Sequence, residues 1–353
     1  MNPPSNNHVA NGDNHVREKQ LARRARLRYV SDAQPGYARR RAGNGFFYLD
    51  VAGKRVADEG EIERIKSLVI PPAWQDVWIC QWPNGHLQST GRDDLDRKQY
   101  LYHPRWREAS ENHKFHRLAE FGEQLPRIRR KVSRDLAKEE WSPERLAALA
   151  VRLLDRAAMR VGSREYTRDN ETYGLTTLTS RHLRITDSKL EFHFIGKGNK
   201  PQHYKLRDRR LAKLLSDLKT QRTEILLGYR EGKREVKASA AMINDYLQEF
   251  TGLEITAKDF RTWKASVIAT SCLWDCEEIV PPEKVLFKKA VELAAESLGN
   301  TVAICRKHYI HPQLLESDAS DEIAAVMKKF RPQKRRQLRI PEQRLLHLLQ
   351  ESS

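Results

Sequence analysis

The chain has 353 residues, a formal net charge of +17 at pH 7 and a sequence pI near 9.7. This length suggests about two domains of roughly 100–200 residues each. The positive balance favours a polyanionic partner, because basic side chains displace the counterions condensed on phosphates. No apolar run approaches the roughly 20 residues of a membrane span. The N-terminus also lacks the apolar core of a secretory signal, so a membrane or secreted protein is not expected.

The first third of the chain predicts a flexible tail and then a small β-rich domain. Residues 1 to about 16 are rich in Asn, Pro, Gly and Ser, which favours disorder. A helix is expected at about residues 61–68. Strand-like segments bounded by turn residues lie at 46–49, 77–82 and 86–90. We expect a flexible basic tail over residues 1–34 and a β-rich DNA-binding domain over residues 35–111.

From about Asn112 the hydrophobic spacing becomes helical. Leucines at 146, 149, 153 and 154 form one apolar helix face. Hydrophobic residues such as Leu190 and Phe192 alternate with polar neighbours, which predicts a β interlude over residues 175–206. The chain is expected to turn at Lys197 within it. We expect a helical catalytic domain over residues 112–330 and a basic C-terminal tail over residues 331–353. A short helix should start in that tail at Pro341.

The predicted fold class is therefore α+β. A small β-rich N-terminal domain precedes a mainly α-helical catalytic domain that contains a small β-hairpin sheet. The four cysteines, at 80, 272, 276 and 305, contain no CxxC pair and no disulfide-framework spacing. This usage fits a reducing compartment, so we expect a cytoplasmic protein that works at the nucleoid.

Four residues in distinctive contexts can together break a phosphodiester without a metal. Tyr309 is a candidate nucleophile, although a phenol with a pKa near 10 needs help to ionise. Arg160 and Arg261 can each hold phosphate oxygens with two parallel hydrogen bonds. Lys197, at the tip of the expected hairpin, can protonate the leaving oxygen. Each residue alone has an ordinary structural explanation, so the prediction depends on their order and context together.

At this point the sequence resembles a known family, the type IB DNA topoisomerases of the short, poxvirus-like bacterial group. The resemblance covers residues 70 to 312 in the family's order. Its segments are IPPAWQDVWIC, GRDDLDRKQYLYHP, RVGSREYTRDNETYGLTTL, FIGKGNK, KDFRTWKAS and LGNTVAICRKHYIHP.

The resemblance implies an activity and a set of roles. Tyr309 would nick one strand of duplex DNA through a 3′-phosphotyrosyl bond, and religation would follow strand swivelling. Arg160 and Arg261 would bind the phosphate, and Lys197 would act as the general acid. No ATP, cofactor or divalent metal would be required. The catalytic domain would be similar to that of tyrosine recombinases, and a monomer would encircle double-stranded DNA as a clamp.

One position departs from the pattern of many family members. A histidine often stands where this chain has Asn300, in the segment LGNT. An amide can donate a hydrogen bond to a phosphate oxygen, but it carries no charge and takes no proton. We therefore assign Asn300 to neutral donation in the transition state. His308 and His311 are interpreted as helix-surface or DNA-backbone residues.

A second constellation predicts DNA contacts in the N-terminal domain. On a strand, Tyr100 and Tyr102 would face one side and Gln99 the other. Gln can bind adenine bidentately in the major groove, and Tyr can contact phosphate or a thymine methyl group. A half-buried aromatic strand face is the structural alternative. By the family resemblance, Tyr166 is a phosphate contact.

Three alternatives stay open at this point. Acidic residues at positions 93, 94 and 96 could hold Mg²⁺ in a metal-dependent nuclease. Tyrosine recombinases share the nucleophile, but they usually show His-x-x-Arg where this chain has Lys258 three residues before Arg261. A non-enzymatic basic nucleoid-binding protein would fit the charge equally well.

Overall fold

The computed structural model describes residues 18–43, 45–162, 167, 171–274, 283–315, 320–334 and 337–351. The chain divides into a smaller unit, residues 1–114, and a larger unit, residues 115–353. The long helix α3 (Pro104–Asp135) begins in the first unit and continues into the second. Eight of its residues, 104–111, precede the expected domain boundary after residue 111. The expected disorder of residues 1 to about 16 lies outside the described residues.

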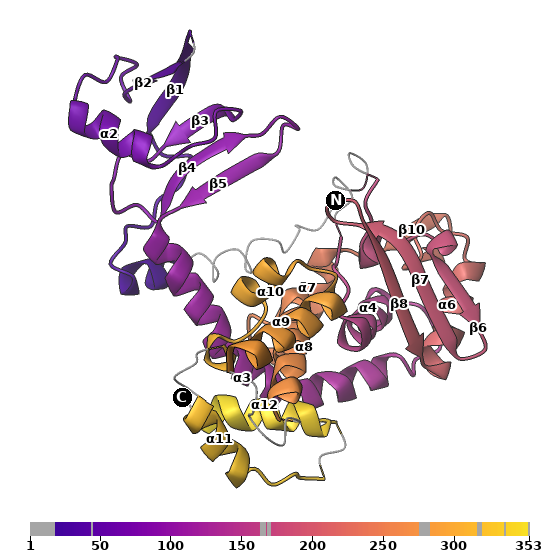
Figure 1. Ribbon diagram of the computed structural model, residues 1–353. Helices are drawn as coiled ribbons and strands as arrows, with labels where there is room; N and C mark the ends of the chain where they lie inside the picture. The colour runs from indigo at the N-terminus through magenta and orange to yellow at the C-terminus, as the bar shows by residue number, and fades with distance from the viewer. Residues whose placement is uncertain are drawn as a thin grey trace. The chain divides into compact units, whose positions relative to one another are not determined.

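The smaller unit is built on a five-stranded antiparallel sheet with the order β2-β1-β3-β4-β5 (Figure 1). Helix α2 (Glu59–Ser67) starts at Asp58, whose side chain accepts from the backbone N–H of Glu61 and so caps the helix. The strands are β1 (Tyr37–Ala42), β2 (Gly45–Leu49), β3 (Gln75–Ile79), β4 (Leu87–Arg92) and β5 (Lys98–Tyr102). The predicted helix and the three predicted strands are confirmed within a few residues.

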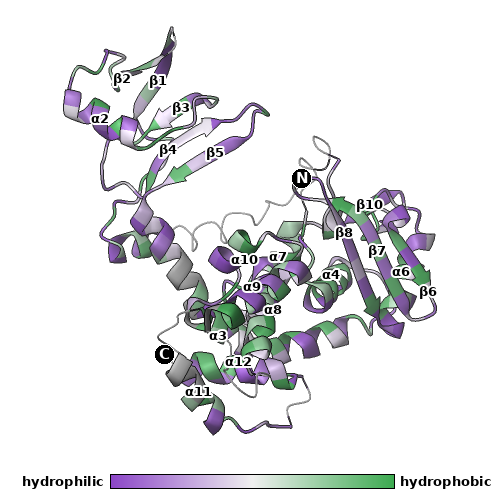
Figure 2. Ribbon diagram, viewed as in Figure 1, coloured by the Kyte–Doolittle hydropathy of each residue, from purple (hydrophilic) through white to green (hydrophobic). Residues whose placement is uncertain are grey.

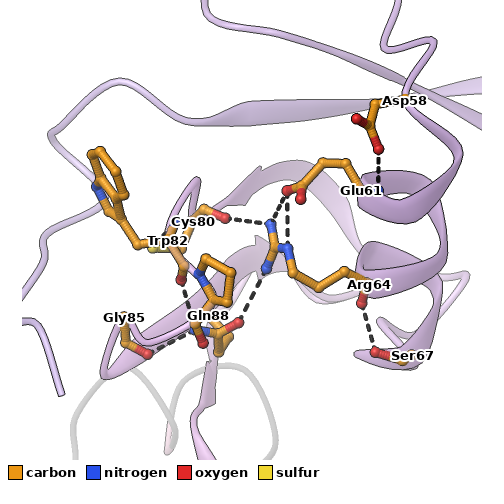
Figure 3. A network of polar contacts seen from close by, with 9 residues as sticks. Asp58, Glu61, Arg64, Ser67, Cys80, Trp82, Gly85 and Gln88 are labelled. Carbon is orange, nitrogen blue, oxygen red and sulfur yellow. Dashed lines mark hydrogen bonds and ion pairs between the residues drawn. The ribbon is translucent and has the colours of Figure 1, made fainter. Parts of the chain in front are cut away.

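A polar network around Arg64 ties helix α2 to the β3–β4 turn (Figure 3). The guanidinium donates to the side chain of Glu61 and to the backbone carbonyl of Cys80, at 2.8 Å. It also donates to the side chain of Gln88 at 3.3 Å. The Gln88 amide in turn donates to the carbonyl oxygen of Gly85 at 2.7 Å. Because Gln88 is buried, these bonds satisfy its polar atoms and fix the turn.

The larger unit is mainly helical. Its helices are α4 (Pro143–Ala157), α6 (Arg209–Thr220), α7 (Ala240–Thr251), α8 (Ala257–Trp274), α9 (Glu283–Leu298), α10 (Val302–His308), α11 (Ser320–Lys329) and α12 (Ile340–Glu351). Short 3-10 turns lie at Leu175–Thr177, Ser180–His182 and Pro312–Leu314. Helix α8 packs against α4, α9 and α12. Together with the sheets described next, this arrangement confirms the α+β class.

Two small antiparallel sheets complete the larger unit. One contains β6 (Leu183–Thr186), β7 (Lys189–Gly196) and β8 (Lys200–Arg207) in sequence order. Buried and more exposed positions alternate along β7, so one face of this sheet is buried, and Figure 2 shows both hydrophobic and hydrophilic residues in the sheet. The other contains β9 (Gly228–Glu231) and β10 (Arg234–Lys237). This second hairpin and strand β1 are two elements that the sequence patterns did not predict, because both are rich in charged residues.

The C-terminal segment belongs to the core of the larger unit. Leu345, Leu346, Leu348 and Leu349 of α12 are buried in the main hydrophobic cluster. The helix predicted from Pro341 is confirmed. A basic tail was expected over residues 331–353, but the described part of this segment packs into the core. Similarly, Ala22 and Leu27, from the expected N-terminal tail, are buried beside Trp106.

One buried arginine fastens α12 to the helices before it. Arg129 of α3 is 7% exposed and donates to Asp155 of α4 at 2.7 Å and to Glu342 of α12 at 2.7 Å. It also donates to the backbone carbonyl of Gln337. Buried charges must be paired to be tolerated, so three helices meet at this guanidinium.

We predict that Arg129→Ala strongly destabilises the larger unit. The substitution leaves two buried carboxylates without their cation, which costs about 3–5 kcal/mol. Chemical denaturation followed by helical circular dichroism measures the loss. The matched control is Arg130→Ala, at the next, exposed position, which should change stability by less than about 0.5 kcal/mol. Equal stability of the two variants would contradict the anchoring role.

Candidate functional site

Arg261 lies at the meeting point of two helix ends. This residue of α8 is 3% exposed. Its guanidinium donates to the carbonyl oxygen of Ala158 at 2.5 Å and to that of Leu298 at 3.1 Å. Ala158 is the C-cap of α4 and Leu298 is the last residue of α9. Because helix C-termini carry partial negative charge, both carbonyls stabilise the buried cation.

The end of α9 places Asn300 beside this arginine. Gly299 adopts φ +60°, and the N–H of Asn300 donates to the carbonyl of Ala295 at 2.9 Å. The Gly299 N–H donates to the carbonyl of Glu296 at 3.1 Å, which completes a Schellman motif. Asn300 Oδ1 then accepts from Arg261 Nη2 at 3.4 Å. A glycine at the left-handed position therefore determines where the amide lies.

Arg160 reaches the same amide oxygen from the segment after α4. Its Nη2 donates to Asn300 Oδ1 and to the Gly299 carbonyl oxygen, the latter at 3.2 Å. Burial lowers the pKa of Arg160, and the positive charge of Arg261 lowers it further. Among the described residues, no carboxylate forms an ion pair with either guanidinium. One buried guanidinium, of Arg261, and one partly buried guanidinium, of Arg160, thus share one neutral acceptor.

Tyr309 follows directly from this cluster through the short helix α10. Thr301 caps the helix N-terminus by accepting from the N–H of Ile304 at 3.3 Å, and Tyr309 is the C-cap. Arg261 lies over the Tyr309 ring, with its Cζ 5.2 Å from the ring centroid. The phenol and both arginines are therefore assembled in one place from α8, α10 and the end of α4.

The backbone around Tyr309 is held on both sides by Ser266 of α8. The buried Ser266 hydroxyl donates to the Tyr309 carbonyl at 3.3 Å and accepts from the His311 N–H at 3.1 Å. The hydrophobic residue Ile310 between them is fully buried. These contacts fix the position of Tyr309 relative to Arg261, since both depend on the same helix.

Two donors in this cluster have no hydrogen-bond partner among the described residues. Arg261 Nε and Asn300 Nδ2 are buried and make no hydrogen bond within the part of the chain that the structure describes. A buried donor left unpaired costs about 1–3 kcal/mol. An oxyanion is the chemical group that would satisfy such donors beside two uncompensated arginines.

Lys197 lies at the tip of the β7–β8 hairpin, as the sequence predicts. The register pairs Gly196 with Lys200, and the turn contains two left-handed residues, Gly198 at φ +75° and Asn199 at φ +56°. The Lys197 side chain is exposed. The base of this turn approaches the cluster, because a Cβ at Gly196 would lie 2.7 Å from Gln202 Cγ and one at Gly299 would lie 2.5 Å from Gln202 Oε1.

Tyr204 and Ser266 are two site residues that the sequence reasoning missed. Tyr204 is largely buried beside both arginines: burial raises its pKa, while the charges of Arg261 and Arg160 oppose the shift. Its strand position, directly opposite Phe192, predicts only core packing. Ser266 carries no sequence signal, because its role depends on a backbone 43 residues away.

In the smaller unit, the predicted DNA-contact residues differ in exposure and in the contacts that they already make. Tyr100 and Tyr102 lie on one face of β5 with nearly parallel rings, 6.1 Å between centroids, and Tyr100 is 47% exposed. Tyr102 packs against Trp106. Gln99 donates from Nε2 to Asp93 at 2.8 Å, so its amide is engaged within the hairpin. Tyr166 lies outside the described residues.

The acidic run that suggested a metal site organises the β4–β5 turn. Asp93 accepts from the backbone N–H groups of Leu95 and Arg97, each at 3.0 Å, and from the Arg97 side chain at 2.6 Å. These bonds lower the pKa of Asp93 to about 2. Its oxygens are therefore occupied by donors, which does not favour the nuclease alternative. Within the described ranges, no group of three or more His, Cys, Asp or Glu side chains could hold a metal ion.

None of the described helices is both long and apolar enough to cross a membrane.

Comparison with known families gives two matches. Residues 103–337 match the family described as eukaryotic DNA topoisomerase I, catalytic core, which covers more than half of the 353 residues. Residues 45–93 match the bacterial DNA topoisomerase IB N-terminal domain.

Individual relatives agree with these matches. The chain is 30% identical to DNA topoisomerase 1B of Acanthamoeba polyphaga mimivirus over 291 residues, which is 80% of this chain and 87% of the relative. It is 24% identical to DNA topoisomerase 1B of vaccinia virus strain Copenhagen over 77% of this chain and 86% of the relative. A solved XerH site-specific recombinase bound to difH is 16% identical, covering 57% of this chain and 52% of its own, with a TM-score of 0.36, too low to establish a common fold.

We predict that the arginine–asparagine cluster binds an inorganic oxyanion. Sulfate should stabilise the wild-type protein more than Arg160→Ala, since ligand at about ten times its Kd adds about 1.4 kcal/mol to the bound fold. Thermal unfolding over a sulfate series at constant ionic strength measures this difference. Arg152→Ala, an arginine of α4 that pairs with Asp208, is the control and should respond like wild type. Identical sulfate responses in all three proteins would show that the cluster binds no anion.

Proposed function

The chain belongs to the type IB DNA topoisomerases, and from this membership we propose that Tyr309 is its nucleophile and the Arg160–Asn300–Arg261 cluster its phosphate site. The enzyme is an isomerase of DNA. The proposed reaction relaxes supercoiled duplex DNA by transient cleavage of one strand, followed by religation. One observation carries this proposal: Arg261 Nε and Asn300 Nδ2 are buried donors that make no hydrogen bond in the described part of the chain, and Arg261 lies over the Tyr309 ring.

In the proposed reaction, the scissile phosphate occupies the space between the two arginines. Their forks donate to its non-bridging oxygens, and Asn300 Nδ2 adds a neutral donor. These donors are preorganised, because both guanidiniums are already held by backbone carbonyls at helix ends. Negative charge that builds up on the phosphorus-bound oxygens in the transition state is stabilised there, without reorganisation of the site.

Cleavage then follows as an in-line displacement. The Tyr309 phenolate oxygen attacks phosphorus, the bond from phosphorus to the 5′-oxygen breaks, and a 3′-phosphotyrosyl bond forms. The positive charge of Arg261 beside the ring stabilises the charge on the attacking oxygen. The departing 5′-oxygen takes a proton from the Lys197 ammonium. Religation is the reverse, with the 5′-hydroxyl as nucleophile and Tyr309 as leaving group.

The partner we propose is double-stranded DNA, bound by a monomer that closes around it as a clamp. The charge of +17 supports backbone binding that weakens with salt. In the smaller unit, the exposed Tyr100 ring, with Lys98 Nζ 5.6 Å from its centroid, is the proposed DNA contact on β5. The Tyr102 ring stacks beside that of Tyr100. Tyr166 remains a proposed phosphate contact. Gln99 would have to leave Asp93 to bind a base.

The proposed chemistry needs neither ATP nor a divalent metal, because protein cations supply the charge that a metal would otherwise provide. Since the proposed substrate is the bacterial chromosome, the proposed place of action is the cytoplasmic nucleoid. The recombinase alternative requires specific paired sites, whereas relaxation of any plasmid does not.

We predict that Tyr309→Phe abolishes plasmid relaxation in EDTA and keeps the affinity for DNA. The change removes one oxygen, so the nucleophile is lost while the charge of the chain is unchanged. A gel assay of relaxation and a binding titration at fixed salt measure the two properties. Loss of relaxation with binding retained separates the enzyme from a basic nucleoid-binding protein. Relaxation by Tyr309→Phe at the wild-type rate would refute the assignment.

We predict that Asn300→Ala slows cleavage about 10²–10³-fold with little change in DNA binding, since one preorganised donor is removed. Single-turnover cleavage of a duplex measures the rate. The slowing should be the same across pH 6 to pH 8, because an amide does not titrate in this range. A wild-type cleavage rate in Asn300→Ala, or a slowing that depends on pH, would contradict neutral donation.

A further inference from the structure

Gln202 is a buried polar residue on the hairpin that carries Lys197. It lies on β8 opposite Phe194 and is 7% exposed. Its Nε2 makes weak local contacts with the carbonyl oxygens of Lys200, at 3.4 Å, and Pro201, at 3.2 Å. An apolar residue would fill such a buried strand position at lower desolvation cost. The side chain is nevertheless buried here, and its packing shows what it contacts.

The Gln202 side chain fills the space between two glycines. A Cβ on Gly196 would lie 2.7 Å from Gln202 Cγ, and a Cβ on Gly299 would lie 2.5 Å from Gln202 Oε1. Real Cβ atoms do not approach this closely, so neither position accepts a side chain while Gln202 is in place. Gly196 directly precedes Lys197, and Gly299 directly precedes Asn300. One side chain thus contacts the backbone before the proposed acid and the backbone before the phosphate donor.

Tyr204 completes the connection to the arginines. Its hydroxyl donates to Gln202 Oε1 at 3.2 Å, and its ring lies in the electrostatic field of Arg261 and Arg160. The carboxamide is therefore oriented, with its oxygen toward Tyr204 and Gly299. Contacts with Gly299 on one side and Gly196 on the other make Gln202 the packed link between the hairpin turn and the phosphate site.

We propose that Gln202 is a positioning residue that holds the β7–β8 turn against the Gly299–Asn300 loop, so that Lys197 reaches the leaving oxygen. The inference depends on the proposed role of Lys197 as the acid. The turn itself is exposed and contains two left-handed residues, so the strands alone leave its approach to the phosphate loosely defined. Packing of one buried side chain between two backbones supplies the missing constraint.

The test uses two duplex substrates that differ in the leaving atom. In one, the 5′-bridging atom at the cleavage site is oxygen; in the other it is sulfur. A thiol has a pKa near 8.5, so a thiolate leaves without protonation, whereas an alkoxide needs the acid. Gln202→Ala should cleave the oxygen substrate about 10–10²-fold more slowly than wild type, the size of a misplaced catalytic group. It should cleave the sulfur substrate near the wild-type rate.

Two further variants make the result specific. Gln202→Met fills the same space without the amide and should recover most of the rate, because the proposal depends on packing between the glycines. His203→Ala, at the adjacent exposed position of β8, should cleave both substrates like wild type. Equal slowing of Gln202→Ala on both substrates, or no slowing, would overturn the positioning role. A Met variant as slow as the Ala variant would overturn the packing mechanism.

Lys197→Ala separates this inference from the proposed function. It should be slow on the oxygen substrate and near normal on the sulfur substrate. If Lys197→Ala is slow on both while Gln202→Ala is rescued by sulfur, the acid assignment fails and Gln202 positions another acid. If Lys197→Ala cleaves the oxygen substrate like wild type, Gln202 has no acid to position on this turn, and the inference fails with it.

Discussion

The site depends on the confinement of two arginine side chains around one amide oxygen. Arg160 and Arg261 both donate to Asn300 Oδ1, and no carboxylate in the described part of the chain neutralises them. Two like charges that share one acceptor repel each other, by a few kcal/mol at an effective dielectric of about 20. Backbone carbonyls at the ends of α4 and α9 offset part of this repulsion. The rest favours an anion between the guanidiniums, which supports the proposal that phosphate binds there.

The amide at position 300 suits this arrangement because it can accept and donate at once. Its oxygen faces both guanidiniums, since turning Nδ2 toward them would oppose donors to donors. The orientation of Nδ2 is thereby fixed, and Nδ2 makes no hydrogen bond within the described ranges. A protonated imidazole could not accept from either arginine. Asn300 therefore combines two tasks, holding the arginines in place and presenting a donor, and neither depends on pH.

The sequence predicted the identities of the clustered residues better than their connections. Tyr309, Arg160, Arg261 and Asn300 occur in distinctive segments, and the structure brings them together. The turn at Lys197 followed from strand alternation and two glycines. These are local signals, which a pattern can detect.

The contacts between distant segments were not predictable in the same way. Tyr204 and Gln202 looked like ordinary strand residues, because their meaning depends on Gly299 nearly one hundred positions later. Gln99 appeared available for base contact, but Asp93 six residues away uses its amide. Strand β1 shows no alternation of hydrophobic and polar residues, because three consecutive arginines lie in it. An arginine can still occupy such a strand by laying its side chain over an aromatic ring, and Arg39 Cζ lies 4.2 Å from the centroid of the Phe46 ring.

The C-terminal helix extends the scaffold of the site beyond the residues that touch a substrate. Asp155, which pairs with Arg129, lies three residues before Ala158, whose carbonyl receives Arg261. Arg129 also pairs with Glu342 of α12, so the end of α4 is fixed from the opposite side by a segment that follows Tyr309 in the chain. The residues that we propose to hold the phosphate are thus supported by buried contacts, whereas Lys197, the proposed acid, lies on an exposed turn. This division is physically reasonable: the phosphate must be held still while the attacking and leaving oxygens exchange, but the acid has to approach only the oxygen that departs.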